Sequence, residues 1–438
     1  MRKVSLAEIV LFIVFGLTAL IWVRVVEFRG FTFASYHFAT AALIIFVLIS
    51  TYYFRSGWVV FRASAPIWLA SMLLILVTFV SYATGSKDFG LREVLRPLFY
   101  TAGGLCAASI VYGVIRSRPT NALALAGLAT IAIFLAFTHL ALRAEHVDSL
   151  ALVMRAIATG DPNVILYDLF GTLFRESGYV GQDEALANLR HEIFFMLLVS
   201  AVLSLSMVRN QTRSRRMLVY AAAAFIGFLC LISLSRSVWL AIFSIAMATG
   251  FLFVVKTRGG GLYLALLTPF AAVASFVVLR SPFLSLFANR LNEETSYDER
   301  IFASSYRLSE IYQNPVFPQI PAGMGWAHNI LIDYWSASGI LGIIAALLYV
   351  GAFAWLAIAH AVNYLGTKDP QMAAMSLAGL ALILIPSTRI FTCPIGQLFL
   401  AGQLAVGCSA ALFTACRVAR WQAGRSASQT VPLRLSFR

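Results

Sequence analysis

The sequence predicts an all-α polytopic membrane protein with about twelve transmembrane helices. Hydrophobic residues make up 60% of its 438 residues and charged residues only 12%, whereas about 45–50% and about 25% are typical of soluble domains. The mean hydropathy is +0.83. Long apolar runs alternate with short connections, and basic residues gather on every second connection. These observations exclude an ordinary soluble domain.

The apolar runs locate the expected spans, because a transmembrane helix needs about 20 apolar residues. We interpret the first run as a retained helix, since no small-residue cleavage site follows it. The expected helices cover residues 6–26, 33–54, 58–82, 95–115, 121–142, 192–208, 217–235, 237–255, 262–280, 329–360, 372–388 and 394–416. An even number of spans places both termini on one side of the membrane.

The short connections on one side of the membrane carry many basic residues and a single acid, Asp369. By the positive-inside rule this side is cytoplasmic, and so are both termini. We expect one transmembrane domain over residues 1–416 and a basic, disordered cytoplasmic tail over 417–438. The basic residues are Arg2, Lys3, Arg55, Arg62, Arg116, Arg118, Arg209, Arg213, Arg215, Arg216, Lys256, Arg258, Lys368 and those of the tail.

Two long segments, at about 143–191 and 281–328, face the opposite side and hold most of the acidic residues. Both mix short apolar pieces with charges, which is typical of interfacial helices that lie on a membrane. We expect such helices there rather than a separate soluble domain.

The cysteines and histidines do not indicate a metal site. All five cysteines lie in apolar segments and are expected to be small buried hydrophobes. The histidines other than His328 form no cluster with carboxylates or cysteines. We therefore expect no metal or other cofactor. The excess of basic over acidic residues is explained by the membrane topology, so it does not indicate a nucleic-acid partner.

Two arginines occupy span ends on the non-cytoplasmic face. Arg236, in LSLSRSVWLA, lies between two apolar runs with almost no loop and is expected to cap a tight helical hairpin. Arg389 lies at the outer end of the eleventh expected span, beside Pro386. An arginine in such a place is costly unless it faces protein or a polar ligand. Snorkelling of Arg236 to the interface and a helix-end anchor at Arg389 are the alternative interpretations.

A third arginine site follows Arg290 in ERIFASSYRLSEIYQNP. Arg300, Ser304 and Arg307 share one face of the expected helix, because seven residues make nearly two turns. At a rise of about 1.5 Å per residue the two guanidinium groups are about 10 Å apart and can hold a diphosphate. The alternative is a solvated face paired with neighbouring glutamates. The apolar residues at helical spacing are Ile301, Leu308, Ile311 and Tyr312.

His328 opens the helix that begins AHNILIDYW. The positive end of the helix dipole disfavours the protonated ring, and a neutral imidazole can act as a general base. Asn329 either caps the helix or orients the histidine. Asp333 is an acid inside a membrane-entering helix, which favours a functional or histidine-orienting role. Glycines at positions 339 and 342 permit close packing.

Three landmarks in this order resemble the O-antigen ligase and polymerase superfamily of bacterial envelope glycosyltransferases. SLSRSVWLA resembles the family's Ser-Arg hairpin motif. Arg300, followed by Asn-Pro at 314–315 and Gly-Met-Gly at 323–325, resembles the pattern of its large periplasmic loop. AHNILIDYWSASGILG resembles the His-Asn motif that opens the next helix. The motifs cover about 236–345, although the spacer before His328 is shorter than in the family and a proline-rich VFPQIP precedes the glycines.

The resemblance implies glycan transfer from a polyprenyl diphosphate donor to an acceptor hydroxyl, with inversion and without a metal or nucleotide sugar. It implies a bacterial inner-membrane protein with two periplasmic loops and a periplasmic active site in which His328 is the base. It implies donor diphosphate contacts for Arg236 and Arg300, and with the residues at helical spacing or nearby we expect four such arginines, namely Arg236, Arg290, Arg300 and Arg307. The residues implied in support are Asn329, Asp333, Arg389 and Arg175.

The motifs leave the acceptor open. A ligase transfers the glycan to lipid A-core, which is the favoured interpretation, whereas a polymerase for O-antigen or exopolysaccharide uses a second lipid-linked repeat. A transporter or flippase for lipid-linked glycans is an alternative of another class, and it predicts arginines spread toward the middle of several spans. A structural scaffold leaves the coincidence of arginines and histidine unexplained.

Overall fold

The protein is described here from a computed structural model. The structure describes residues 9–10, 13, 16, 24–28, 31–85, 91–117, 122–175, 183–208, 212–257, 285, 288–290, 295–318, 320, 326–390 and 400–429. Within these ranges, eight helices are long and apolar enough to cross a membrane, or nine if a bent pair counts as one span. The predicted helical membrane protein is confirmed, and the number twelve stays a prediction. The expected span 262–280 lies outside the described residues.

The chain differs from the expectation near its start. Residues Arg24–Phe28 (β1) and Phe31–Ala34 (β2) form a short antiparallel hairpin, so the expected helices 6–26 and 33–54 do not extend through these ends. Valine, threonine and phenylalanine dominate both strands, and these residues favour extended backbone.

The next segment is also divided differently. Helix α2 (Ser35–Ile49) bends by 100° into α3 (Thr51–Ala63), and α4 (Ala65–Ala83) follows. We expected a connection at 55–57 between two spans, with Arg55 and Arg62 beside it. This boundary is wrong, because residues 51–63 form a separate helix that contains both arginines. Ser64 precedes α4, and a proline in the first turn of α4 suits a helix start.

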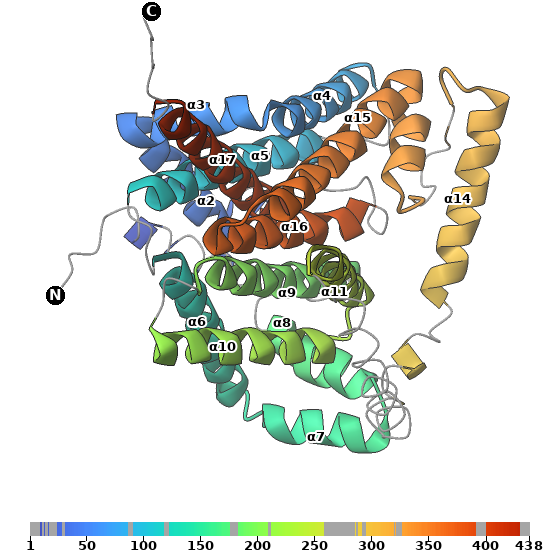
Figure 1. Ribbon diagram of the computed structural model, residues 1–438. Coiled ribbons are helices and arrows are strands. Elements are labelled where there is room, and N and C mark those ends of the chain that lie inside the picture. The colour runs from blue at the N-terminus through green and yellow to red at the C-terminus, as the bar shows by residue number, and fades with distance from the viewer. Residues whose placement is uncertain are drawn as a thin grey trace, which may run out of the picture.

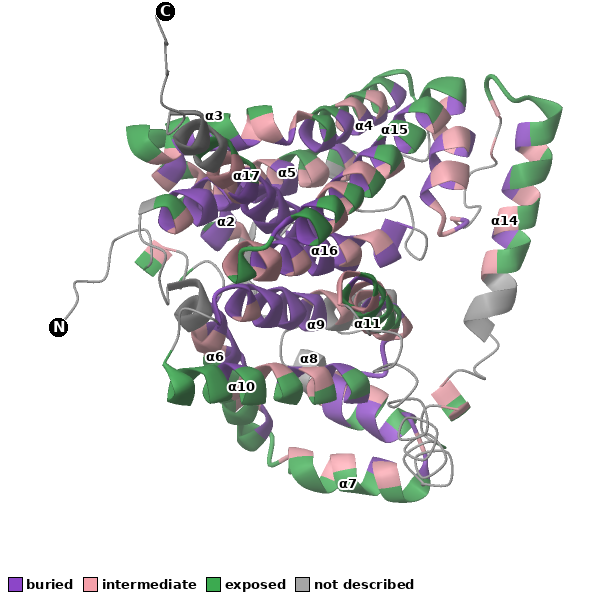
Figure 2. Cartoon of the chain, in the orientation of Figure 1, coloured by how far each residue is buried: buried purple, intermediate pink, exposed green. Residues whose placement is uncertain are grey.

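Four helices form the centre of the molecule: α5 (Leu91–Ser117), α15 (Ile330–Gly366), α16 (Pro370–Ile390) and α17 (Leu400–Gln429). Figure 2 shows α16 and α17 mostly buried. Glycines let α5 and α17 approach closely, since a Cβ on Gly407 would collide with the backbone carbonyl of Gly104. Small residues at helix contacts are the usual means of tight packing in membranes.

Helices α6 (Ala122–Ala144), α9 (Asp183–Ser206), α10 (Arg213–Ile232) and α11 (Arg236–Lys256) lie around this centre. In Figure 1, α9 lies between α16 and α10, and the three run in nearly the same direction. Large apolar side chains of α10 and α11 are exposed, among them Met217, Phe243 and Phe251. Such exposure suits helices that face lipid.

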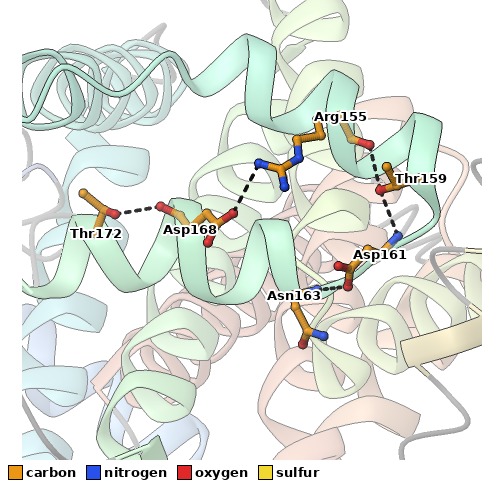
Figure 3. Close-up of polar contacts among 6 residues, drawn as sticks. All are labelled: Arg155, Thr159, Asp161, Asn163, Asp168 and Thr172. Atoms are coloured by element: carbon orange, nitrogen blue, oxygen red, sulfur yellow. Dashed lines mark hydrogen bonds and ion pairs between the residues drawn. The ribbon is translucent and has the colours of Figure 1, made fainter.

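The first long segment forms α7 (Ser149–Thr159), a π-helical turn η1 (Val164–Leu169) and α8 (Phe170–Arg175). Figure 3 shows the polar contacts that fold α7 back onto η1. Arg155 and Asp168 form an exposed ion pair at 3.9 Å, and the backbone N–H of Asn163 donates to Asp161 at 2.9 Å. The second long segment holds α14 (Thr295–Gln313), which runs across the helix bundle at one edge of the molecule (Figure 1).

The last helix is longer than expected. Helix α17 continues past residue 416 to Gln429, so the first half of the expected disordered tail is helical. Arg420 fixes this extension by donating to the carbonyl of Asn363 at 2.7 Å. Alanine, arginine and glutamine in RVARWQAGRSASQ favour helix, and the next proline comes only at 432.

Candidate functional site

The hairpin between α10 and α11 presents Arg236 as the first residue of α11. Leu234 adopts a left-handed backbone with φ of 53° in the three-residue turn that joins α10 to α11. The hydroxyl of Ser235 accepts from the backbone N–H of Val238 at 3.3 Å and caps α11. The predicted tight hairpin is confirmed, and its serines are used in the turn.

Arg236 and Arg290 join the hairpin turn to the second long segment. Nη2 of Arg236 donates to the carbonyl of Arg290 at 2.6 Å, and Nε of Arg290 donates to the carbonyl of Leu234 at 3.2 Å. Burial lowers the pKa of Arg290, and the charges of Arg236 and Arg300 act in the same direction, against Tyr167. Since a guanidinium stays protonated in proteins, three positive charges gather here and favour an anion.

The arginine face of α14 is turned toward the protein. The hydroxyl of Ser304 donates to the carbonyl of Ala327 at 3.3 Å. Arg307 is fully buried, with Nη1 donating to Ser336 at 2.6 Å and the guanidinium 4.5 Å from the ring centre of Trp326. Since Ser304 follows Arg300 by about one turn, Arg300 lies about one turn of α14 from this contact with the residue that precedes His328.

The apolar residues of α14 have the opposite orientation. Ile301, Leu308 and Tyr312 are exposed, and only Ile311 of the predicted apolar set is buried. The shared arginine face is thus confirmed, but it is the inner face of the helix and not a solvated one. The sequence predicts a diphosphate contact for Arg307, whereas the structure covers its guanidinium with protein.

His328 lies in a turn whose backbone is held by two hydrogen bonds to the carboxylate of Asp333, which we call the clamp. The two carboxylate oxygens of Asp333 accept from the backbone N–H of Ala327 at 2.8 Å and of Asn329 at 3.1 Å, one on each side of the histidine. His328 has a left-handed backbone with φ of 59°, and such strain is frequent at functional sites. Asn329 caps α15 by accepting from Leu331 at 3.0 Å, as predicted.

Helix α15 is broken shortly after this turn. Gly339 has φ of 64° and ψ of −150°, and a side chain there would collide with the carbonyl of Val316. The N–H of Ile340 donates to that carbonyl at 3.3 Å, and the indole of Trp335 donates to Pro315 at 2.8 Å. The Asn-Pro segment after α14 therefore docks into the break, which explains the glycine.

Arg389 belongs to a neighbouring polar cluster that was not predicted. Glu192, which opens the apolar part of α9, accepts from the backbone N–H of Ala401 at 3.3 Å. Arg389 and Arg96 act electrostatically on this carboxylate. The preceding residue, His191, is hydrogen-bonded through Nδ1 to Ser235. An adjacent histidine and glutamate at the start of an apolar run is the signal that identifies this cluster in the sequence.

The structure therefore brings Arg236, Arg290 and Arg300 together, and Ser304 of the same helix as Arg300 contacts the residue before His328. The side chain of Arg175 and the glycines at 323–325 lie outside the described residues. Among the residues that are described, no group of three histidine, cysteine or acidic side chains is placed to hold a metal. The chain matches no model of a known protein family, and no curated protein is similar to it. The family resemblance stays a prediction.

Proposed function

We propose that the protein is a metal-independent membrane glycosyltransferase, which transfers a glycan from a polyprenyl diphosphate to an acceptor hydroxyl. The observation that carries this proposal is the cluster of Arg236, Arg290 and Arg300 beside the clamped turn of His328. Three clustered cations suit a diphosphate, and the helix that carries Arg300 contacts the turn of a histidine that suits proton removal.

In the proposed reaction, the acceptor oxygen forms a bond to the anomeric carbon of the donor. The bond between that carbon and the diphosphate oxygen breaks, and the diphosphate leaves with the electron pair. His328 takes the proton of the acceptor hydroxyl. Arg236, Arg290 and Arg300 stabilise the leaving charge, and such contacts strengthen where water is scarce. Direct displacement inverts the anomeric configuration.

Two further residues support the site in this proposal. Asp333 fixes the turn of His328 through its backbone. Arg307 holds α14 against α15 through Ser336, so we assign it a positioning role in place of a donor contact. Within this class we propose O-antigen ligation to lipid A-core at the periplasmic face of the inner membrane, with polymerisation onto a second lipid-linked repeat as the alternative.

The test is a reconstituted reaction with a synthetic polyprenyl-diphosphate glycan and either lipid A-core or a second lipid-linked glycan as acceptor. The acceptor that is consumed distinguishes ligase from polymerase. His328→Ala should abolish transfer while donor binding is retained. His146→Ala is the matched control, because His146 also has a left-handed backbone, with φ of 56°, and is exposed. Movement of intact donor across the membrane without cleavage would indicate a transporter instead.

A further inference from the structure

Helix α3 has two distinct faces, and this feature is separate from the site above. Its inner face packs on α5, where a Cβ on Gly57 would collide with the hydroxyl of Ser109, and Ser56 and Val60 are buried. The outer face carries a stripe at positions i, i+3, i+4 and i+7, all of it exposed. This stripe consists of Arg55, Trp58, Val59 and Arg62.

The outer stripe is positively charged and has no acidic neighbour among the described residues. The guanidinium of Arg62 stacks on Trp58 at 4.8 Å from the ring centre. Among the described residues, no acidic side chain lies within ion-pair distance of Arg55 or Arg62. The sequence from 28 to 87 contains no aspartate or glutamate.

The end of α17 adds a third arginine and a second tryptophan next to α3. Nη1 of the exposed Arg417 donates to the carbonyl of Ala63, the last residue of α3, at 3.4 Å. Trp421, one turn further along α17, is 57% exposed. No acidic residue follows Asp369 in the chain. We name these five residues the α3 patch: Arg55, Trp58, Arg62, Arg417 and Trp421.

We propose that the α3 patch binds the phosphate headgroup of an anionic phospholipid, with α3 lying in the membrane interface. Tryptophan is favoured at the level of the headgroups, and arginines there attract anionic lipid. Trp58 holds the guanidinium of Arg62 by stacking, and Arg417 contacts the backbone of the next residue, Ala63, which suits a phosphate bound by more than one guanidinium fork. The interleaved aromatic and aliphatic residues favour a lipid surface over a soluble acidic partner.

The test compares lipids by the thermal unfolding of the full-length protein in a neutral detergent. Phosphatidylglycerol should raise the unfolding temperature more than phosphatidylcholine or inorganic phosphate. The double variant Arg55→Gln and Arg62→Gln should raise the half-saturating concentration of phosphatidylglycerol about fivefold for each arginine removed. The matched control is the double variant Arg213→Gln and Arg215→Gln, which removes two exposed charges from α10 and should change that concentration less than twofold.

Three results would overturn the proposal. The first is an equal effect of phosphatidylcholine, and the second is an equal effect of inorganic phosphate, which would indicate a site for a soluble anion. The third is an equal loss in the α10 control, which would indicate diffuse charge. If the α3 variant does not fold, the wild-type protein still tests the proposal through its response to salt, because about 1 M salt screens exposed charges beyond about 3 Å. High salt should then weaken the phosphatidylglycerol effect, and an effect that resists salt contradicts the proposal.

Discussion

The clamp under His328 gives a sharp prediction through the substitution Asp333→Asn. Asp333 is fully buried, and its two oxygens accept the backbone N–H groups of Ala327 and Asn329. Asparagine has nearly the same shape but offers one acceptor oxygen and one NH2 donor. In the variant, the backbone N–H of either Ala327 or Asn329 must therefore face the NH2 group of the asparagine and lose its acceptor.

The magnitude follows from these two contacts. A hydrogen bond to a charged group contributes about 1.5–3 kcal/mol, and a buried donor left unsatisfied costs about 1–3 kcal/mol. The left-handed backbone of His328 costs a further 1–2 kcal/mol or so, which the clamp now offsets. A loss of about 3 kcal/mol corresponds to a roughly 100-fold shift toward the open turn.

Hydrogen–deuterium exchange of the protein in a lipid nanodisc measures this shift without any assumption about activity. The amides of Ala327 and Asn329 should exchange roughly 100-fold faster in Asp333→Asn, by the same free energy. The control is Asp148→Asn, since the exposed Asp148 also accepts two backbone N–H groups, at 3.0 and 3.1 Å, and asparagine is an equally good N-cap. Wild-type protection at both amides in Asp333→Asn would refute the clamp.

The other predictions concern packing and the donor site. Gly339→Ala should lower the free energy of unfolding by about 1–3 kcal/mol in a thermal melt, because a side chain there collides with the docked Asn-Pro segment. The control is Gly227→Ala, whose added Cβ meets nothing within 4 Å and which should be neutral or slightly stabilising. Gly407→Ala should also destabilise, since it forces α17 away from α5; an unchanged melting temperature would contradict that contact. Arg300→Lys should reduce kcat at least tenfold by losing the bidentate fork, while the exposed Arg155→Lys should leave kcat unchanged in the reconstituted reaction.

Local features of the site were predictable because they depend on nearby residues. The hairpin at Arg236 follows from two apolar runs with no loop between them, and the cap at Asn329 follows from the residue type at a helix start. The common face of Arg300 and Arg307 follows from helical spacing alone. In each case the signal and the structure lie within about two turns of chain.

Features that depend on tertiary contacts were not predictable. The amphipathic pattern of α14 does not show which face of the helix packs against the protein. In a membrane protein the apolar face can point outward to lipid. Glu192 meets Arg389 and Ala401 only because α9, α16 and α17 pack together. The π-helical turn and the separate helix α3 depend equally on their neighbours, because an apolar run does not show where it bends.

The break in α15 also separates the site mechanically from the bilayer. The part before Gly339 is fastened to α4, where Ser81 donates to Ser338 at 2.7 Å, and to the Asn-Pro segment through Trp335. The longer part continues from the non-helical Gly339, and its first residue, Ile340, donates to the carbonyl of Val316 in the same Asn-Pro segment. Bilayers of different thickness change the tilt of a spanning helix, and a break in the helix lets the longer part change its tilt without turning the shorter one. His328 is therefore expected to keep its position while the helix that follows it adjusts to thin or thick membranes.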